Sequence, residues 1–170
     1  MATSISSRKR DLFYMVFFCL GIPSMFMVDL QALYPASIVP TFMVDLKAFY
    51  INRYQDQFFI QTPPFFEFFM WTEIFIQAPV MIWGVGALFK GSPKIPLVLL
   101  PYAVLIFVTT GACMYEICYW EVPLVQKFSL STLYGPYLAI SAFMTVDMFL
   151  RINNIINTAS AISTVVKKRQ

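Results

Sequence analysis

Two acidic side chains stand inside long apolar stretches of this chain: Asp29 in the first stretch and Glu73 in the second. An ionisable side chain at membrane depth costs about 2.5–3.5 kcal/mol on insertion scales, so each is by default a functional-site hypothesis. Two carboxyls that face each other cannot both ionise comfortably, so we expect this pair to share one proton. The remaining anion then suits a cationic amine that enters a cavity with aromatic walls. The alternative is that these polar groups only hold helices together.

The numbers and positions of other residue types exclude several kinds of functional site. The chain has no histidine, which excludes His-metal sites, Ser-His and Cys-His nucleophiles, and the usual pH switch. Its three cysteines lie in or beside apolar runs and are odd in number, which argues against a disulfide framework. The 12 lysines and arginines are not gathered into a basic face, which argues against a nucleic-acid binder. We therefore expect no metal, no cofactor and no nucleic-acid partner.

The composition indicates that these acids lie in a membrane. Hydrophobic residues make up 59% of the 170 residues and charged residues only 12%, and the mean hydropathy is +0.68. A soluble domain is usually about 45–50% apolar and about 25% charged. A membrane-spanning helix needs about 20 apolar residues, and four stretches qualify: Leu12 to Tyr34, Phe65 to Phe89, Ile95 to Tyr119 and Leu130 to Leu150. The sequence therefore predicts an all-α membrane protein with a four-helix bundle.

The distribution of basic residues predicts the orientation. With both termini on one side, that side carries nine lysines and arginines: Arg8, Lys9, Arg10, Lys90, Lys94, Arg151, Lys167, Lys168 and Arg169. The other side carries Lys47, Arg53 and Lys127. We therefore expect cytosolic termini and a lumenal loop from Pro35 to Pro64. An apolar stripe at helical spacing within that loop (Phe42, Met43, Leu46, Phe49, Tyr50) predicts a short amphipathic helix that lies on the membrane or caps the bundle.

The polar residues of the four stretches fall in one layer of the predicted bundle. At a rise of about 1.5 Å per residue, Asp29 lies roughly 8 Å and Glu73 roughly 12 Å from the lumenal helix ends. Gln77 shares a helical face with Glu73 because the two are four residues apart. The lumenal half also holds Thr109, Thr110, Tyr134 and Tyr137. We expect a ligand pocket there, with walls that include Phe66, Phe69, Met70, Trp71 and Tyr115.

The chain ends in a basic tail. We expect a cytosolic segment at residues 1–10, the four-helix domain at residues 11–152 and a cytosolic tail at residues 153–170. Lys167 and Lys168 stand fourth and third from the C-terminus, which is the spacing of a di-lysine retrieval signal of the endoplasmic reticulum. The alternative is a charged flank, in which each lysine is attracted to anionic headgroups by about 1 kcal/mol.

Three segments resemble a known family. FMVDLQALYP (Phe26 to Pro35), QTPPFFEFFMWTEIFIQAP (Gln61 to Pro79) and YGPYL (Tyr134 to Leu138) are similar to helices of sigma-2-receptor-type members of the EXPERA family. The order and spacing match from about Arg10 to Leu150. The same family holds the emopamil-binding sterol isomerases and a fungal protein linked to efficient mitochondrial targeting.

The resemblance implies a homodimeric membrane protein of the endoplasmic reticulum that binds sterols and cationic amphiphiles, with a role in sterol homeostasis or trafficking. In this comparison Asp29 resembles the ammonium partner, Glu73 its hydrogen-bonded neighbour and Asp56 a loop acid that supports the pocket. The implied lining residues are Gln77, Thr110 and Tyr137. Two alternatives remain: a sterol double-bond isomerase that uses the Asp29–Glu73 pair in place of the family's histidine, and a chaperone for the membrane segments of client proteins.

Overall fold

The computed structural model describes residues 4–167, with side chains described through residue 162. Four helical segments within this part are long and apolar enough to cross a membrane: Lys9–Leu33, Pro64–Lys90, Ile95–Tyr119 and Leu124–Ile162. The predicted all-α membrane protein is therefore confirmed. The bounds of the third span agree with the prediction, and those of the first two differ from it by one to three residues at each end.

The first span is interrupted near its end. After the short 3₁₀ helix η1 (Ile5–Ser7), α1 runs from Lys9 to Met27, and the 3₁₀ helix η2 (Asp29–Leu33) completes the span. Pro23 lies inside α1 and cannot donate a backbone hydrogen bond, which weakens the final turn of the α-helix. The change of helix type occurs immediately before Asp29.

The second span consists of α4 (Pro64–Thr72), the π-helical turn η4 (Glu73–Gln77) and α5 (Ala78–Lys90). Pro64 starts α4 at its first position, where a missing N–H leaves no bond unmade. Pro79 lacks an N–H, and its ring would clash with the carbonyl of Phe75 in a regular α-helix. The chain widens into a π turn at this point, as helices do where the regular ladder is broken.

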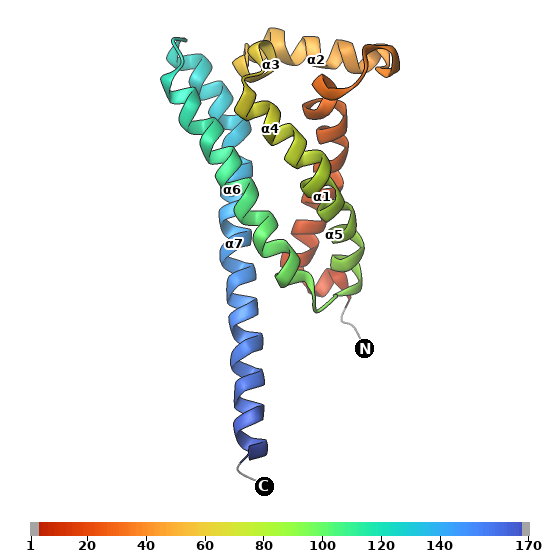
Figure 1. Ribbon diagram of the computed structural model, residues 1–170, viewed down its shortest axis with the longest axis vertical. Helices are drawn as coiled ribbons and strands as arrows, with labels where there is room; N and C mark the ends of the chain where they lie inside the picture. The colour runs from red at the N-terminus through yellow and green to blue at the C-terminus, as the bar shows by residue number, and fades with distance from the viewer. Residues whose placement is uncertain (1–3, 168–170) are drawn as a thin grey trace.

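The last two spans form a long antiparallel pair. Helix α6 runs from Ile95 to Tyr119, and α7 is one continuous helix of 44 residues from Leu124 to Lys167. At about 1.5 Å per residue, α7 is roughly 66 Å long, about twice the thickness of a bilayer core. Figure 1 shows α7 projecting well beyond the end of the bundle. The predicted end of the fourth span at Leu150 is therefore wrong as a helix boundary, because the helix continues through the polar tail.

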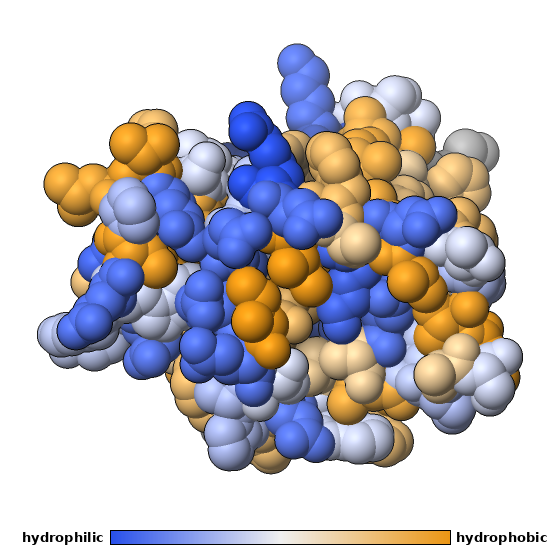
Figure 2. Space-filling model, turned by 90° about the horizontal axis from the view of Figure 1, so that it is seen from above, coloured by the Kyte–Doolittle hydropathy of each residue, from blue (hydrophilic) through white to orange (hydrophobic). Residues whose placement is uncertain are grey.

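The loop between the first two spans covers the opposite end of the bundle. It contains η3 (Ala36–Ile38), α2 (Thr41–Tyr54) and α3 (Gln57–Gln61), and Figure 1 shows α2 lying across the tops of the spans. The helix predicted in this loop is confirmed. Its apolar residues are divided, however, since Met43 is buried whereas Phe42 and Phe49 are exposed. Figure 2 looks onto this end and shows hydrophobic side chains interspersed among hydrophilic ones, which suits a surface that meets lipid.

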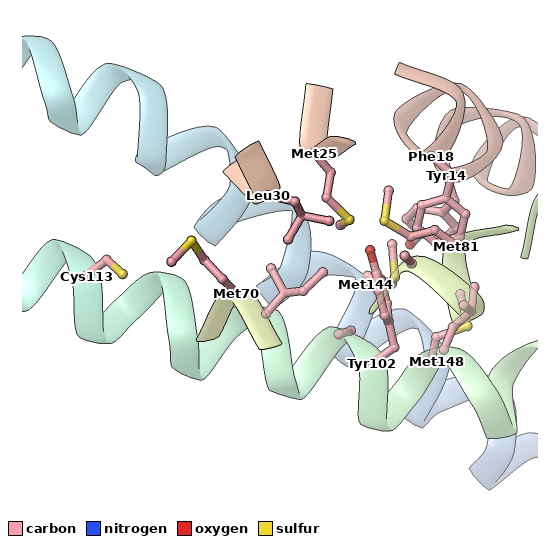
Figure 3. Packing of buried hydrophobic residues seen from close by; sticks show 14 of the residues in the cluster. Tyr14, Phe18, Met25, Leu30, Met70, Met81, Tyr102, Cys113, Met144 and Met148 are labelled. Carbon is pink, nitrogen blue, oxygen red and sulfur yellow. The ribbon is translucent and has the colours of Figure 1, made fainter. Parts of the chain in front are cut away.

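The core lies between two pairs of helices, since α1 packs mainly on α5 and α6 packs along α7. Tyr14 and Phe18 of α1 are completely buried at this junction. Figure 3 shows Met25, Met81, Met144 and Met148 near one another beside these residues, and Met70 further along the bundle toward Cys113. Methionine is flexible and fills irregular space, and the interior of this bundle is therefore adaptable in shape.

Candidate ligand-binding site

A cavity of about 280 Å³ opens inside the bundle, near the lower end of the range typical of small-molecule pockets. Every helix from α1 to α7 contributes to its walls. Five of the residues predicted from the sequence line it together: Asp29, Glu73, Gln77, Thr110 and Tyr137. The remaining lining residues are mainly apolar or aromatic: Phe17, Gly21, Ser24, Met25, Val28, Tyr50, Phe59, Phe66, Met81, Tyr102, Ile106, Thr109, Leu133 and Tyr134.

The two acids reach this cavity from irregular turns. Asp29 is the first residue of η2, directly after the end of α1, and Glu73 is the first residue of the π turn η4. Both side chains are partly buried and line the cavity. No hydrogen bond joins the two carboxyls among the described residues, so the shared proton stays a prediction. π turns occur frequently at functional sites, and this one presents a carboxyl to the cavity.

Two buried polar atoms in the cavity walls have no hydrogen-bond partner within the described part of the chain: Oε2 of Glu73 and the hydroxyl oxygen of Tyr102. A buried polar group without a partner costs about 1–3 kcal/mol. Figure 3 shows the Tyr102 ring extending from α6 toward α1, where it meets Phe18 at 5.4 Å between ring centroids. The site therefore offers hydrogen-bonding capacity that the folded chain does not use.

The other predicted lining residues lie at or beside hydrogen bonds and ring contacts within the fold. The Gln77 side-chain amide donates to the Thr72 hydroxyl at 3.4 Å, a long bond that leaves Gln77 weakly held. Tyr137 lies beside Phe17, with ring centroids 5.7 Å apart, so α1 and α7 meet at the cavity wall. Thr110 lies on α6 next to Thr109, whose hydroxyl is bonded to the carbonyl of Leu105 at 3.0 Å.

Asp56 does not line the cavity but fixes part of its wall. It is completely buried at the start of α3, where its carboxylate accepts from the Phe58 N–H at 3.0 Å. The same carboxylate accepts from the hydroxyls of Tyr50 at 2.8 Å and Tyr134 at 2.9 Å, and both tyrosines line the cavity. Burial raises the pKa of Asp56, while these three hydrogen bonds act to lower it. Asp56 thus holds two wall residues from separate helices in place.

The aromatic walls differ from the prediction. Phe66 lines the cavity, but Phe69, Met70, Trp71 and Tyr115 do not. Trp71 and Tyr115 point outward, with 42% and 67% of their surfaces exposed. Sequence reasoning missed Tyr102, whose spacing to Ile106, Thr109 and Thr110 places all four on one face of α6. That spacing to a pair of threonines was the available signal.

Comparison with known proteins agrees with this arrangement. Residues 42–148 match the model of the family described as EXPERA (EXPanded EBP superfamily). The chain belongs to the EXPERA family. The match covers the second and third spans and most of the fourth, together with α3 and nearly all of α2, and so includes Asp56, Glu73 and Gln77. Asp29 precedes the matched residues, and its place in the site depends on the cavity geometry. No curated protein matches the chain at a significant level.

Proposed function

We propose that this EXPERA membrane protein binds sterols and cationic amphiphiles in the cavity between its helices. The observation that carries the proposal is the placement of two acidic side chains, Asp29 and Glu73, in one apolar cavity. A protonated amine carries a positive charge that balances the negative charge of such an acidic pair. The apolar walls suit the hydrocarbon body of the same ligand.

The unused polar atoms support a second class of ligand. A hydroxyl can accept a hydrogen bond from Tyr102 and donate one to Glu73, so an alcohol such as a sterol satisfies both atoms that lack partners. Amines and sterols would then compete, because both use Glu73 and the same apolar space. This competition distinguishes a binding cavity from a purely structural cluster of polar groups.

The cellular setting is part of the same proposal. We place the protein in the membrane of the endoplasmic reticulum, with both termini in the cytosol, as a homodimer that acts in sterol homeostasis or trafficking. An even number of candidate spans supports the placement of both termini on one side of the membrane. The charge distribution of nine against three supports the cytosol as that side. Lys168 lies outside the described residues, and Lys167 is described only as the last backbone position of α7.

The proposal is tested by equilibrium binding of a labelled cationic amphiphile to the purified protein, with a sterol as competitor. Asp29→Asn keeps the size of the side chain and removes its charge. A desolvated charge pair that loses one partner costs roughly 3–5 kcal/mol, so amine affinity should fall by roughly 100-fold or more. Asp45→Asn is the matched control, because Asp45 stands in a second FMVDL sequence on α2, exposed and outside the cavity.

Two results would contradict the proposal. Equal amine affinity in folded Asp29→Asn and Asp45→Asn protein would exclude Asp29 as the counter-ion. A failure of sterols to compete would show that amines and sterols do not share this cavity. The alternatives have distinct readouts. Migration of a double bond in an unsaturated sterol would identify an isomerase, and crosslinks to membrane-protein precursors that survive a blocked cavity would identify a chaperone.

A further inference from the structure

A second cavity, of about 400 Å³, lies at the end of the bundle opposite α2 and α3. It is bounded by the start of α1, the turn between α5 and α6, the first turn of α6 and the part of α7 that leaves the bundle. Its lining shares no residue with the first cavity: Arg8, Asp11, Gly91, Ser92, Pro93, Ile95, Pro96, Arg151, Asn154 and Ile155. We call it the basic-end cavity.

Two arginines are fixed in the walls of this cavity by one carboxylate. The Asp11 side chain accepts from Arg8 at 2.6 Å through one oxygen and from Arg151 at 2.6 Å through the other. The second terminal nitrogen of Arg8 donates to the carbonyl of Phe89 at 2.9 Å, and that of Arg151 pairs with Asp147 at 2.8 Å. Both guanidinium groups are therefore held at defined positions before any ligand arrives.

The charges around this cavity do not cancel. Arg10 also pairs with Asp147, at 2.7 Å, so three arginines share two aspartates and leave one positive charge in excess. Lys90 and Lys94 stand on either side of the turn that forms one wall, and they add to this excess. An arginine offers five N–H donors in a planar fork that matches the oxygens of a phosphate.

The turn between α5 and α6 is built around one of these arginines. Gly91 ends α5 in the left-handed region, with φ of +67°, and a Cβ at this position would lie 3.2 Å from the guanidinium carbon of Arg8. A side chain here would crowd Arg8. Helix α6 then begins at Ile95, and Ile95 and Pro96 line the cavity, so the positive end of a 25-residue helix faces it.

The position and the apolar walls of the cavity favour a lipid as its ligand. The first span begins at Lys9, and the turn separates the second span from the third, so this cavity lies where the spans end and the membrane meets water. Ile95, Pro96 and Ile155 give it an apolar wall beside the arginines. Such a combination fits a phosphate joined to a glycerol backbone and acyl chains.

We propose that the basic-end cavity binds the phosphate of an anionic membrane phospholipid. The phosphate lies beside the bridge that Arg8, Asp11 and Arg151 form and faces the first turn of α6, and the apolar wall contacts the glycerol region. A soluble phosphate ester carries the same chemistry without acyl chains. This site is independent of the cavity that contains Asp29.

The test changes the charge of the cavity wall without removing a member of the ion pairs. Asn154→Glu places a negative charge on the cavity wall, and Asn153→Glu is the matched control, because Asn153 is its exposed neighbour on α7 and does not line the cavity. Native mass spectrometry of detergent-purified protein measures retention of added phosphatidylserine against phosphatidylcholine. One charge near a membrane surface is worth about 1 kcal/mol, so Asn154→Glu should weaken phosphatidylserine binding about fivefold or more.

The opposite substitution and a soluble competitor complete the experiment. Asn154→Lys should strengthen phosphatidylserine binding, and Asn153→Glu and Asn153→Lys should leave it near the wild-type level. Equal effects of charge at the two positions, or no preference over phosphatidylcholine, would overturn the proposal. Displacement of the lipid by glycerol 3-phosphate at comparable concentrations would identify a soluble phosphate ester as the occupant and overturn the assignment to lipid.

Discussion

Asp56 provides the sharpest test of how the first cavity is built. The substitution Asp56→Ala removes a carboxylate that caps α3 and accepts from Tyr50 and Tyr134. Loss of an N-cap costs about 1 kcal/mol. Each tyrosine hydroxyl left without an acceptor in a buried site costs about 1–3 kcal/mol. The total is about 3–7 kcal/mol, and at roughly 2–4 °C per kcal/mol for a chain of this size the melting temperature should fall by at least about 6 °C.

The measurement is the melting temperature of the detergent-solubilised protein, together with amine affinity. Asp45→Ala is the control, because Asp45 is an exposed acid on α2 in the same loop, and exposed substitutions usually change stability by less than about 0.5 kcal/mol. Amine affinity should fall in Asp56→Ala as well, since both tyrosines line the cavity. If Asp56→Ala and Asp45→Ala have the same melting temperature and the same amine affinity, the supporting role of Asp56 is wrong.

A pH series separates the charge of Asp56 from its hydrogen bonds. Because burial raises its pKa above the ordinary 3.8, the folded protein retains a proton that the unfolded chain releases as the pH rises. The contribution of Asp56 to stability is therefore greatest below about pH 4 and falls as the pH rises through the folded pKa. Asp56→Asn lacks this fall, so its melting temperature relative to the wild type should rise across the same range. An unchanged difference would contradict the raised pKa.

Further outcomes follow from other parts of the chain. Glu73→Gln should keep much of the amine binding because an amide can still donate to Asp29, whereas Glu73→Ala should lose more; equal binding by the two variants in a titration would exclude the hydrogen-bonding role. An engineered glycosylation sequon between Pro35 and Pro64 should be modified in cells and one near the end of α7 should not, as a gel-mobility assay will show; modification of the tail would reverse the proposed orientation. Replacement of both Lys167 and Lys168 by arginine keeps the charge and should release the protein from the endoplasmic reticulum; unchanged localisation by microscopy would leave only a charged flank.

The spans could be predicted because hydropathy accumulates over about 20 residues, and the bounds of α6 were found from it alone. The end of α7 could not be found in this way. Asn153, Asn154 and Asn157 lower the hydropathy, but asparagine does not stop a helix as proline does. No glycine or proline follows Pro136, so the helix continues although the apolar stretch ends.

The part of the site that could be predicted consists of residues whose side chains cost free energy to place in a membrane. Asp29 and Glu73 were found by that argument and Gln77 by its spacing to Glu73, and all three line the cavity. The apolar walls could not be assigned because these spans are hydrophobic around their whole circumference, so the sequence does not show which face turns inward. Trp71 and Tyr115 were misplaced for this reason, and Tyr102 was missed.

The ion pairs of the basic end were also beyond sequence reasoning. Arg10 and Arg151 entered the charge count only as flanking residues. The bond of Arg10 to Asp147 joins α1 to α7 across 137 residues of sequence, and the bond of Arg151 to Asp11 joins them across 140. Such contacts depend on the packed bundle and have no local signature.

The length of α7 determines which charges act on its last described residue. From Arg151 to Lys167 the helix adds 16 residues, and at about 1.5 Å each they carry the backbone roughly 24 Å along the helix axis. At physiological ionic strength the Debye length is about 8 Å. The last described backbone position of α7 therefore lies about three Debye lengths beyond Arg151, so salt screens a charge at Lys167 almost completely from the ion pairs that Arg151 makes with Asp11 and Asp147.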